Sequence, residues 1–165
     1  MILTMPNLFC CFSAVYDNSL ETDLKGDTSG DLEALLVQLN KGQRDESTKV
    51  DKEMAKKDAK ELQEAGVTSW GTDEGKFIGV FTQRSRPQLG ATFPEYKKLT
   101  NKDIADSIDG EMDGDLQKAF MTLVKCVRDP TSFRLNKLQT ALKAGDTKAV
   151  AAIILTRIRR SWMSL

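Results

Sequence analysis

The sequence contains one segment twice, and this internal repeat constrains the fold more than any other feature. Residues 27–45, DTSGDLEALLVQLNKGQRD, align with residues 111–129, EMDGDLQKAFMTLVKCVRD. A weaker match pairs residues 72–84 with residues 145–157. The two matches indicate a repeating unit of roughly 75 to 85 residues, since self-similarity at a fixed distance marks an internal repeat.

The spacing of the apolar residues predicts an all-α chain. Between Leu116 and Val127 the apolar residues recur at helical spacing, and no segment shows the alternation typical of a strand. The expected helices cover residues 47–66, 75–84, 87–99, 101–109, 116–127 and 132–143. The apolar face predicted for the last of these helices comprises Leu135, Leu138, Ala141 and Leu142.

Several residues predict where these helices begin and end. Thr72 and Asn101 are expected N-caps, because their side-chain oxygens can accept hydrogen bonds from the first backbone N–H groups of a helix. Gly66 is expected to end one helix, and Pro130 should stop the helix that precedes it. Pro94 should break or kink the helix that contains it.

The composition excludes several classes of function. Lys and Arg number 24 and Asp and Glu number 24, so the chain has no overall field to hold nucleic acid, and we expect no such partner. The absence of His excludes Ser-His-Asp and Cys-His catalytic arrangements and His-bound zinc. No paired general acid and base, activated nucleophile or phosphate-binding loop is recognisable, so we do not expect an enzyme.

The cysteines and the N-terminal segment indicate in which cellular compartment the chain is expected. Cys10 and Cys11 are adjacent and Cys126 is alone, which favours free thiols in a reducing cytoplasm over a disulfide framework. Cys126 is expected to be a small core residue. The apolar stretch 1–16 has no basic residue before it and falls short of the about 20 apolar residues that a membrane span needs. We therefore expect neither a signal peptide nor a transmembrane helix.

The acidic run DIADSIDGEMDGDL suggests calcium, and an EF-hand is the first possibility. A loop that starts at Asp109 would offer Asp109, Glu111 and Asp113 as ligands, with Gly114 at the required sixth position. The twelfth position requires a Glu that binds through both oxygens, but Phe120 occupies it. The EF-hand interpretation therefore fails at its most important ligand.

A second calcium hypothesis pairs this acidic run with a glycine loop elsewhere in the chain. Gly66 and Gly71 flank a loop between two predicted helices, and glycine permits backbone angles that aim carbonyl oxygens outward. Calcium takes about six to eight oxygen ligands, which loop carbonyls and the carboxylate of Glu111 could supply in part. The alternative is that Glu111 is merely a carboxylate at a helix terminus.

The same residues resemble a known family. The loop WGTDE, the run GEMDGDL and the segments DTSGDL, DAKEL, EYKKLTNKDI and KCVRD resemble the annexins, and the resemblance extends from Tyr16 to Arg157. It implies a fold of helical repeats with five helices each. It also implies calcium-dependent binding to anionic phospholipid, with calcium as the cofactor.

The resemblance further implies a truncated array of repeats. Residues 16–66 correspond to the last three helices of one repeat, residues 67–143 to a complete repeat, and residues 144–165 to the first helix of another. Residues 1–15 would be an apolar leader that does not resemble annexin sequence.

For the complete repeat, the resemblance implies a main calcium site and a weaker accessory site. The implied residues are Gly66, Ser69 and Gly71 through their carbonyls and Glu111 through its carboxylate for the main site, and Thr72 and Glu74 for the accessory site. Trp70 at the tip of the loop would contact lipid, although a core position is the alternative. Asp27 matches the acidic partner of an incomplete site and is more simply a helix cap.

The main functional hypothesis is a cytoplasmic, non-enzymatic protein that binds acidic phospholipid membranes peripherally when calcium rises. A single complete site predicts weak avidity, because multivalency would be missing. The alternative is a helical fragment that self-associates or pairs with a partner through the exposed apolar faces of incomplete repeats, without binding membrane by itself.

Overall fold

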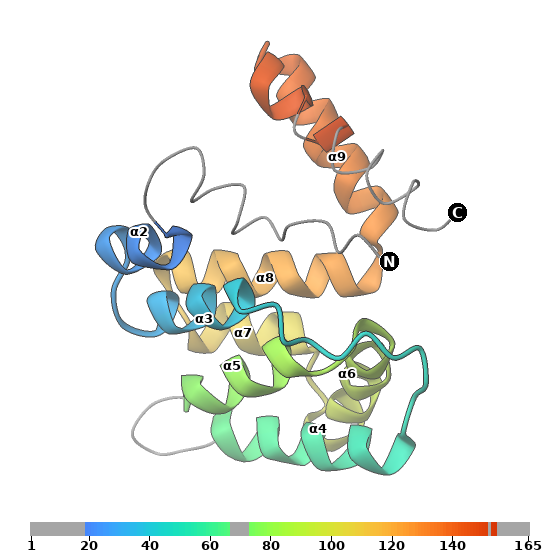
Figure 1. Ribbon diagram of the computed structural model, residues 1–165. Coiled ribbons are helices and arrows are strands. Elements are labelled where there is room, and N and C mark those ends of the chain that lie inside the picture. Colours follow the sequence, from blue (N-terminus) through green and yellow to red (C-terminus); the bar gives the residue numbers. More distant parts are fainter. Residues whose placement is uncertain (1–18, 67–72, 152, 155–165) are drawn as a thin grey trace, which may run out of the picture. The chain divides into compact units, whose positions relative to one another are not determined.

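The computed structural model describes residues 19–66, 73–151 and 153–154, and every regular element in these ranges is an α-helix (Figure 1). The predicted all-α fold is confirmed. The helices are α2 (Leu20–Asp27), α3 (Gly30–Asn40), α4 (Lys52–Gly66), α5 (Glu74–Gln83), α6 (Arg86–Thr100), α7 (Ile104–Glu111), α8 (Gly114–Arg128) and α9 (Pro130–Lys143). No helix in the described ranges is long and apolar enough to cross a membrane.

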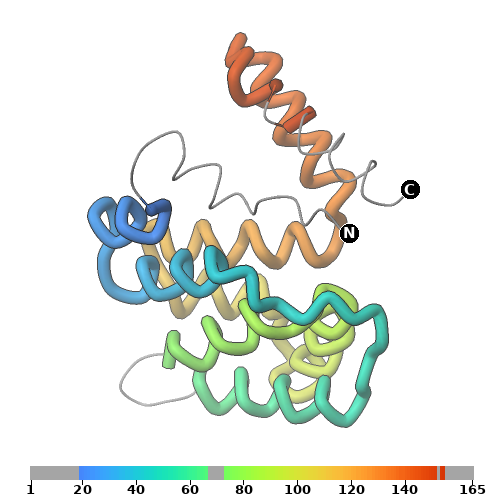
Figure 2. Tube along the Cα trace, in the orientation of Figure 1, coloured from blue at the N-terminus to red at the C-terminus, as the bar shows by residue number. Residues whose placement is uncertain are grey.

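The chain divides within α8 into two compact units, Met1–Met121 and Thr122–Leu165. In the first unit α4 packs most extensively against α6, and α3 lies against α5 (Figures 1 and 2). The core of this unit is aromatic. The ring of Phe81 meets that of Phe120 edge to face at 5.2 Å and that of Phe93 at 5.7 Å, an arrangement that rings favour. Phe77 joins the same cluster and is fully buried.

The internal repeat of the sequence is also a repeat of local structure. A short helix ends in an extended residue, Thr28 after α2 and Met112 after α7. The next helix then begins at a glycine with positive φ, 62° at Gly30 and 60° at Gly114. Only glycine adopts this left-handed conformation without steric cost, which explains why both copies have glycine at this position.

Two predicted N-caps are wrong. The N-cap of α5 is Asp73 rather than Thr72, and its side chain accepts a hydrogen bond from the N–H of Lys76. Asn101 ends α6 in a left-handed conformation, and Asp103 caps α7. In both places a carboxylate stands one or two residues closer to the helix and accepts the N–H bonds instead.

Helix α6 continues through Pro94, so the predicted break is absent. The proline removes the hydrogen bond to the carbonyl of the residue four positions earlier, which is Gly90. Gly90 is exposed, so the loss need not leave a buried polar group unpaired. Helix α9 also departs from prediction, because Leu135 and Leu142 are 59% and 60% exposed, whereas Ala141 is buried. Cys126 is half-buried rather than in the core.

Helix α4 begins at Lys52, later than predicted, because the side chain of Asp51 accepts from the N–H groups of the first turn. The residues before it form an extended connection between α3 and α4 (Figure 2). Asp51 exchanges two backbone hydrogen bonds with the buried side-chain amide of Gln88, both at 2.8 Å. Arg44 donates to the carbonyls of Phe81 and Arg84 at the C-terminal end of α5. The connection therefore ties α3 and α4 to α5 and α6.

Candidate functional site

The predicted calcium loop lies between α4 and α5. Four of its predicted residues, Ser69, Trp70, Gly71 and Thr72, lie outside the described residues. Both ends of the loop are described and are joined to each other, because the N–H of Asp73 donates to the carbonyl of Ala65 at 3.0 Å.

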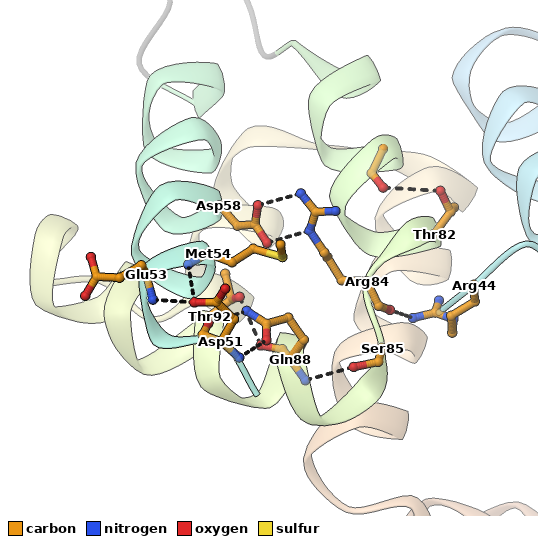
Figure 3. A network of polar contacts seen from close by, with 11 residues as sticks. Arg44, Asp51, Glu53, Met54, Asp58, Thr82, Arg84, Ser85, Gln88 and Thr92 are labelled. Atoms are coloured by element: carbon orange, nitrogen blue, oxygen red, sulfur yellow. Dashed lines mark hydrogen bonds and ion pairs between the residues drawn. The ribbon is translucent and has the colours of Figure 1, made fainter. Parts of the chain in front are cut away.

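An ion pair holds together the two helices that carry this loop. The guanidinium of Arg84, just after α5, donates from Nε to Oδ2 of Asp58 at 2.7 Å and from Nη2 to Oδ1 at 2.9 Å (Figure 3). Asp58 lies on α4 and is fully buried. Two parallel bonds to one carboxylate fix direction as well as distance. Asp58 and Arg84 therefore fix the positions of the helices on either side of the loop.

The structure brings together two of the predicted ligands, Gly66 and Glu111. A Cβ atom built on Gly66 would lie 2.6 Å from Oε2 of Glu111, closer than real Cβ atoms come to other atoms. Gly66 is the last residue of α4 and is not among the glycines with positive φ. A side chain at position 66 would therefore displace the Glu111 carboxylate, and the backbone angles at Gly66 do not require glycine.

The carboxylate of Glu111 is partly dehydrated although the residue as a whole is exposed. Loss of hydration raises the pKa of Glu111, and the positive charge of Lys102 opposes the rise. A carboxylate that has lost water favours a nearby cation, because the cation replaces the lost hydration of the charge. The influence of Lys102 on Glu111 was not predicted, since Lys102 lies in the segment EYKKLTNKDI and only the fold brings the two residues near.

The other predicted acidic residues have separate places. Glu74 is the first residue of α5 and is half-buried, directly after the N-cap Asp73. Asp27 ends α2 and is exposed. Within the described ranges, no group of three or more His, Cys, Asp or Glu side chains is placed to hold a metal ion. Gly66 and Glu111 are thus the predicted ligands that the described residues show close together.

Comparison with known proteins gives one family. The annexin family model matches residues 57–123, from within α4 to within α8. Annexin A13 of Canis lupus familiaris is 46% identical over 148 residues, which cover 88% of this chain and 47% of the relative. Annexin A3 of Mus musculus is 44% identical over 143 residues, which cover 87% of this chain and 44% of the relative. The chain therefore spans less than half the length of these relatives.

Solved structures give the same result. A structure of annexin III matches with a TM-score of 0.78 and 44% identity, over 81% of this chain and 42% of that chain. A calcium-bound annexin (Sm)1 matches with a TM-score of 0.73 and 26% identity, over 86% of this chain and 43% of that chain. The similarity thus extends from the sequence to the arrangement of the helices.

Proposed function

Since the chain belongs to the annexin family, we propose that it binds anionic phospholipid membranes in a calcium-dependent manner. The observation that supports this most directly is the contact between the Glu111 carboxylate and Gly66 at the start of the loop. The calcium-bound state of one structural relative supports the choice of ion. We propose a binding protein rather than an enzyme, located in the cytoplasm and on membrane surfaces.

The donor chemistry at this place fits calcium. A carboxylate and backbone carbonyl oxygens are the ligands that this hard cation prefers. We propose that Glu111 provides the carboxylate and that Gly66, Ser69 and Gly71 provide carbonyl oxygens. Thr72 and Glu74 would form a weaker accessory site, and Trp70 would contact the lipid interface. Calcium held there would supply the positive charge that attracts lipid phosphate oxygens.

We further propose that residues 67–143 form the complete repeat, flanked by partial repeats at residues 16–66 and 144–165. The sequence carries one complete pair of glycine loop and acidic partner in this arrangement. Membrane avidity should therefore be weak compared with a protein that uses several sites at once.

A second candidate function is self-association or pairing with another protein. It is favoured by α9, where Leu135 and Leu142 lie two turns apart and are more than half exposed. Exposed leucines aligned on one helix face favour contact with another apolar surface.

Vesicle co-sedimentation tests the proposal. The protein should sediment with phosphatidylserine vesicles in calcium and remain in the supernatant in chelator or with phosphatidylcholine vesicles alone. Equal sedimentation in calcium and chelator would contradict calcium dependence. No sedimentation in either, together with a mass above one chain in analytical ultracentrifugation, would favour self-association instead.

A further inference from the structure

Glu111 is the last residue of α7, a helix of only 8 residues. Ile104 and Ile108 are buried and turn one face of this helix toward the core. Glu111 stands at the C-terminal end of this helix, so polar contacts near that end contribute to the direction of its carboxylate.

One such contact lies a single helical turn before Glu111. The hydroxyl groups of Tyr96 on α6 and Ser107 on α7 are hydrogen-bonded at 3.0 Å, and the two residues are only 2% and 3% exposed. Ser107 and Glu111 are four residues apart, so they lie on the same face of α7. The bond therefore acts on the face of the helix from which the carboxylate projects.

The pKa of Tyr96 is consistent with this arrangement. Burial raises the pKa of the Tyr96 hydroxyl, the hydrogen bond with Ser107 lowers it, and the charge of Glu111 adds to the rise.

Contacts among three helices, α4, α6 and α7, connect Gly66 to Glu111. Helix α4 ends at Gly66 and packs extensively against α6, which carries Tyr96. Tyr96 is bonded to Ser107 of α7, and Glu111 of α7 returns to Gly66. The α4–α6 packing and the Tyr96–Ser107 hydrogen bond are thus two of the connections that link Gly66 to Glu111.

We propose that Tyr96 is a positioning residue for the calcium site, which holds Glu111 against Gly66 through its hydrogen bond with Ser107. This inference rests on the proposed calcium-dependent function. A positioning role can be separated from a purely structural role by measuring calcium affinity as well as stability. A purely structural hydrogen bond stabilises the ion-free and ion-bound protein equally, whereas a positioning bond changes the affinity for the ion.

The test uses Tyr96→Phe and Ser107→Ala, each of which removes one hydroxyl, and the double variant. The calcium concentration for half-maximal binding to phosphatidylserine vesicles should rise by about threefold to tenfold in each single variant, as expected for one buried hydrogen bond. The double variant should show no more than the larger single effect, because both changes break the same bond.

Thr82→Val is the matched control. Its hydroxyl is also buried and donates to the carbonyl of Ile78 at 2.7 Å, but Thr82 lies on α5. It should lower the thermal midpoint without changing the calcium concentration. Circular dichroism would establish that each variant is folded, and Ser107→Ala decides the question if Tyr96→Phe does not fold.

The outcomes separate the two proposals. If the parent protein does not bind vesicles in calcium, the proposed function fails and Tyr96 has no site to position. If the parent binds and Tyr96→Phe and Ser107→Ala bind at unchanged calcium concentrations, the positioning role alone is overturned. It is equally overturned if Thr82→Val raises the calcium concentration as much as they do.

Discussion

At the scale of single residues, the site depends on one close approach. The sequence indicated both Gly66 and Glu111, because a glycine loop followed by an acidic residue has a recognisable pattern. It did not indicate that a side chain at position 66 would meet a carboxylate, because the fold brings Glu111 there from 45 positions further along the chain, at the end of α7. Tyr96 and Lys102 lie in the segment EYKKLTNKDI, but the sequence does not show that the fold brings them near Glu111.

Gly66→Ala should weaken calcium binding without weakening the fold. Its added Cβ would lie 2.6 Å from Oε2 of Glu111, so the flexible carboxylate must move away. The calcium concentration for half-maximal vesicle binding should rise about tenfold, corresponding to about 1.4 kcal/mol. Stability to urea should be unchanged or higher by up to about 1 kcal/mol, because alanine is favoured over glycine at helical backbone angles.

Gly79→Ala is the control for this prediction. Gly79 lies within α5, and a Cβ there would meet no atom within 4 Å. It should gain similar stability and leave the calcium dependence unchanged. A Gly66→Ala protein that binds at the parent calcium concentration would show that the close approach has no part in binding.

At the scale of helices, the repeat pattern and the apolar spacing correctly predicted that the elements are helices. The exact ends of the helices depend on which of several neighbouring polar residues caps each helix. Asp73 and Asp103 displaced the predicted caps Thr72 and Asn101, because a carboxylate nearer the helix was available. Pro94 was tolerated within α6 since Gly90, its lost bonding partner, is exposed. The ion pair between Asp58 and Arg84 could not be predicted, because its partners come from different helices.

Arg84→Met should destabilise the first unit by about 3 kcal/mol, because it leaves the buried carboxylate of Asp58 without its partner. Lys56→Met is the control, since the pair of Lys56 and Glu53 is exposed to solvent and should contribute little to stability. Urea unfolding followed by circular dichroism measures both. Equal losses in the two variants would show that the buried pair does not hold α4 and α5 together.

At the scale of the whole chain, the all-α fold and the resemblance to annexins could be predicted from the sequence, because the resemblance extends over most of the chain. The exposure of the leucines of α9 could not be predicted from the sequence. Leu135 and Leu142 have helical spacing that predicts burial, but burial also requires a neighbouring surface, and spacing does not provide one. The chain spans less than half the length of the relatives it matches, and the exposed leucines of α9 are the basis of the self-association alternative.

The central claim is that the Glu111 carboxylate binds calcium beside Gly66, and a paired charge substitution tests it most directly. Glu111→Gln and Asp106→Asn each remove one exposed carboxylate from α7 at nearly constant size. Calcium titrations of binding to phosphatidylserine vesicles should show a large loss of affinity for Glu111→Gln and little change for Asp106→Asn, although both alter the net charge equally. Parent-like binding by Glu111→Gln, or an equal loss in both variants, would contradict the account.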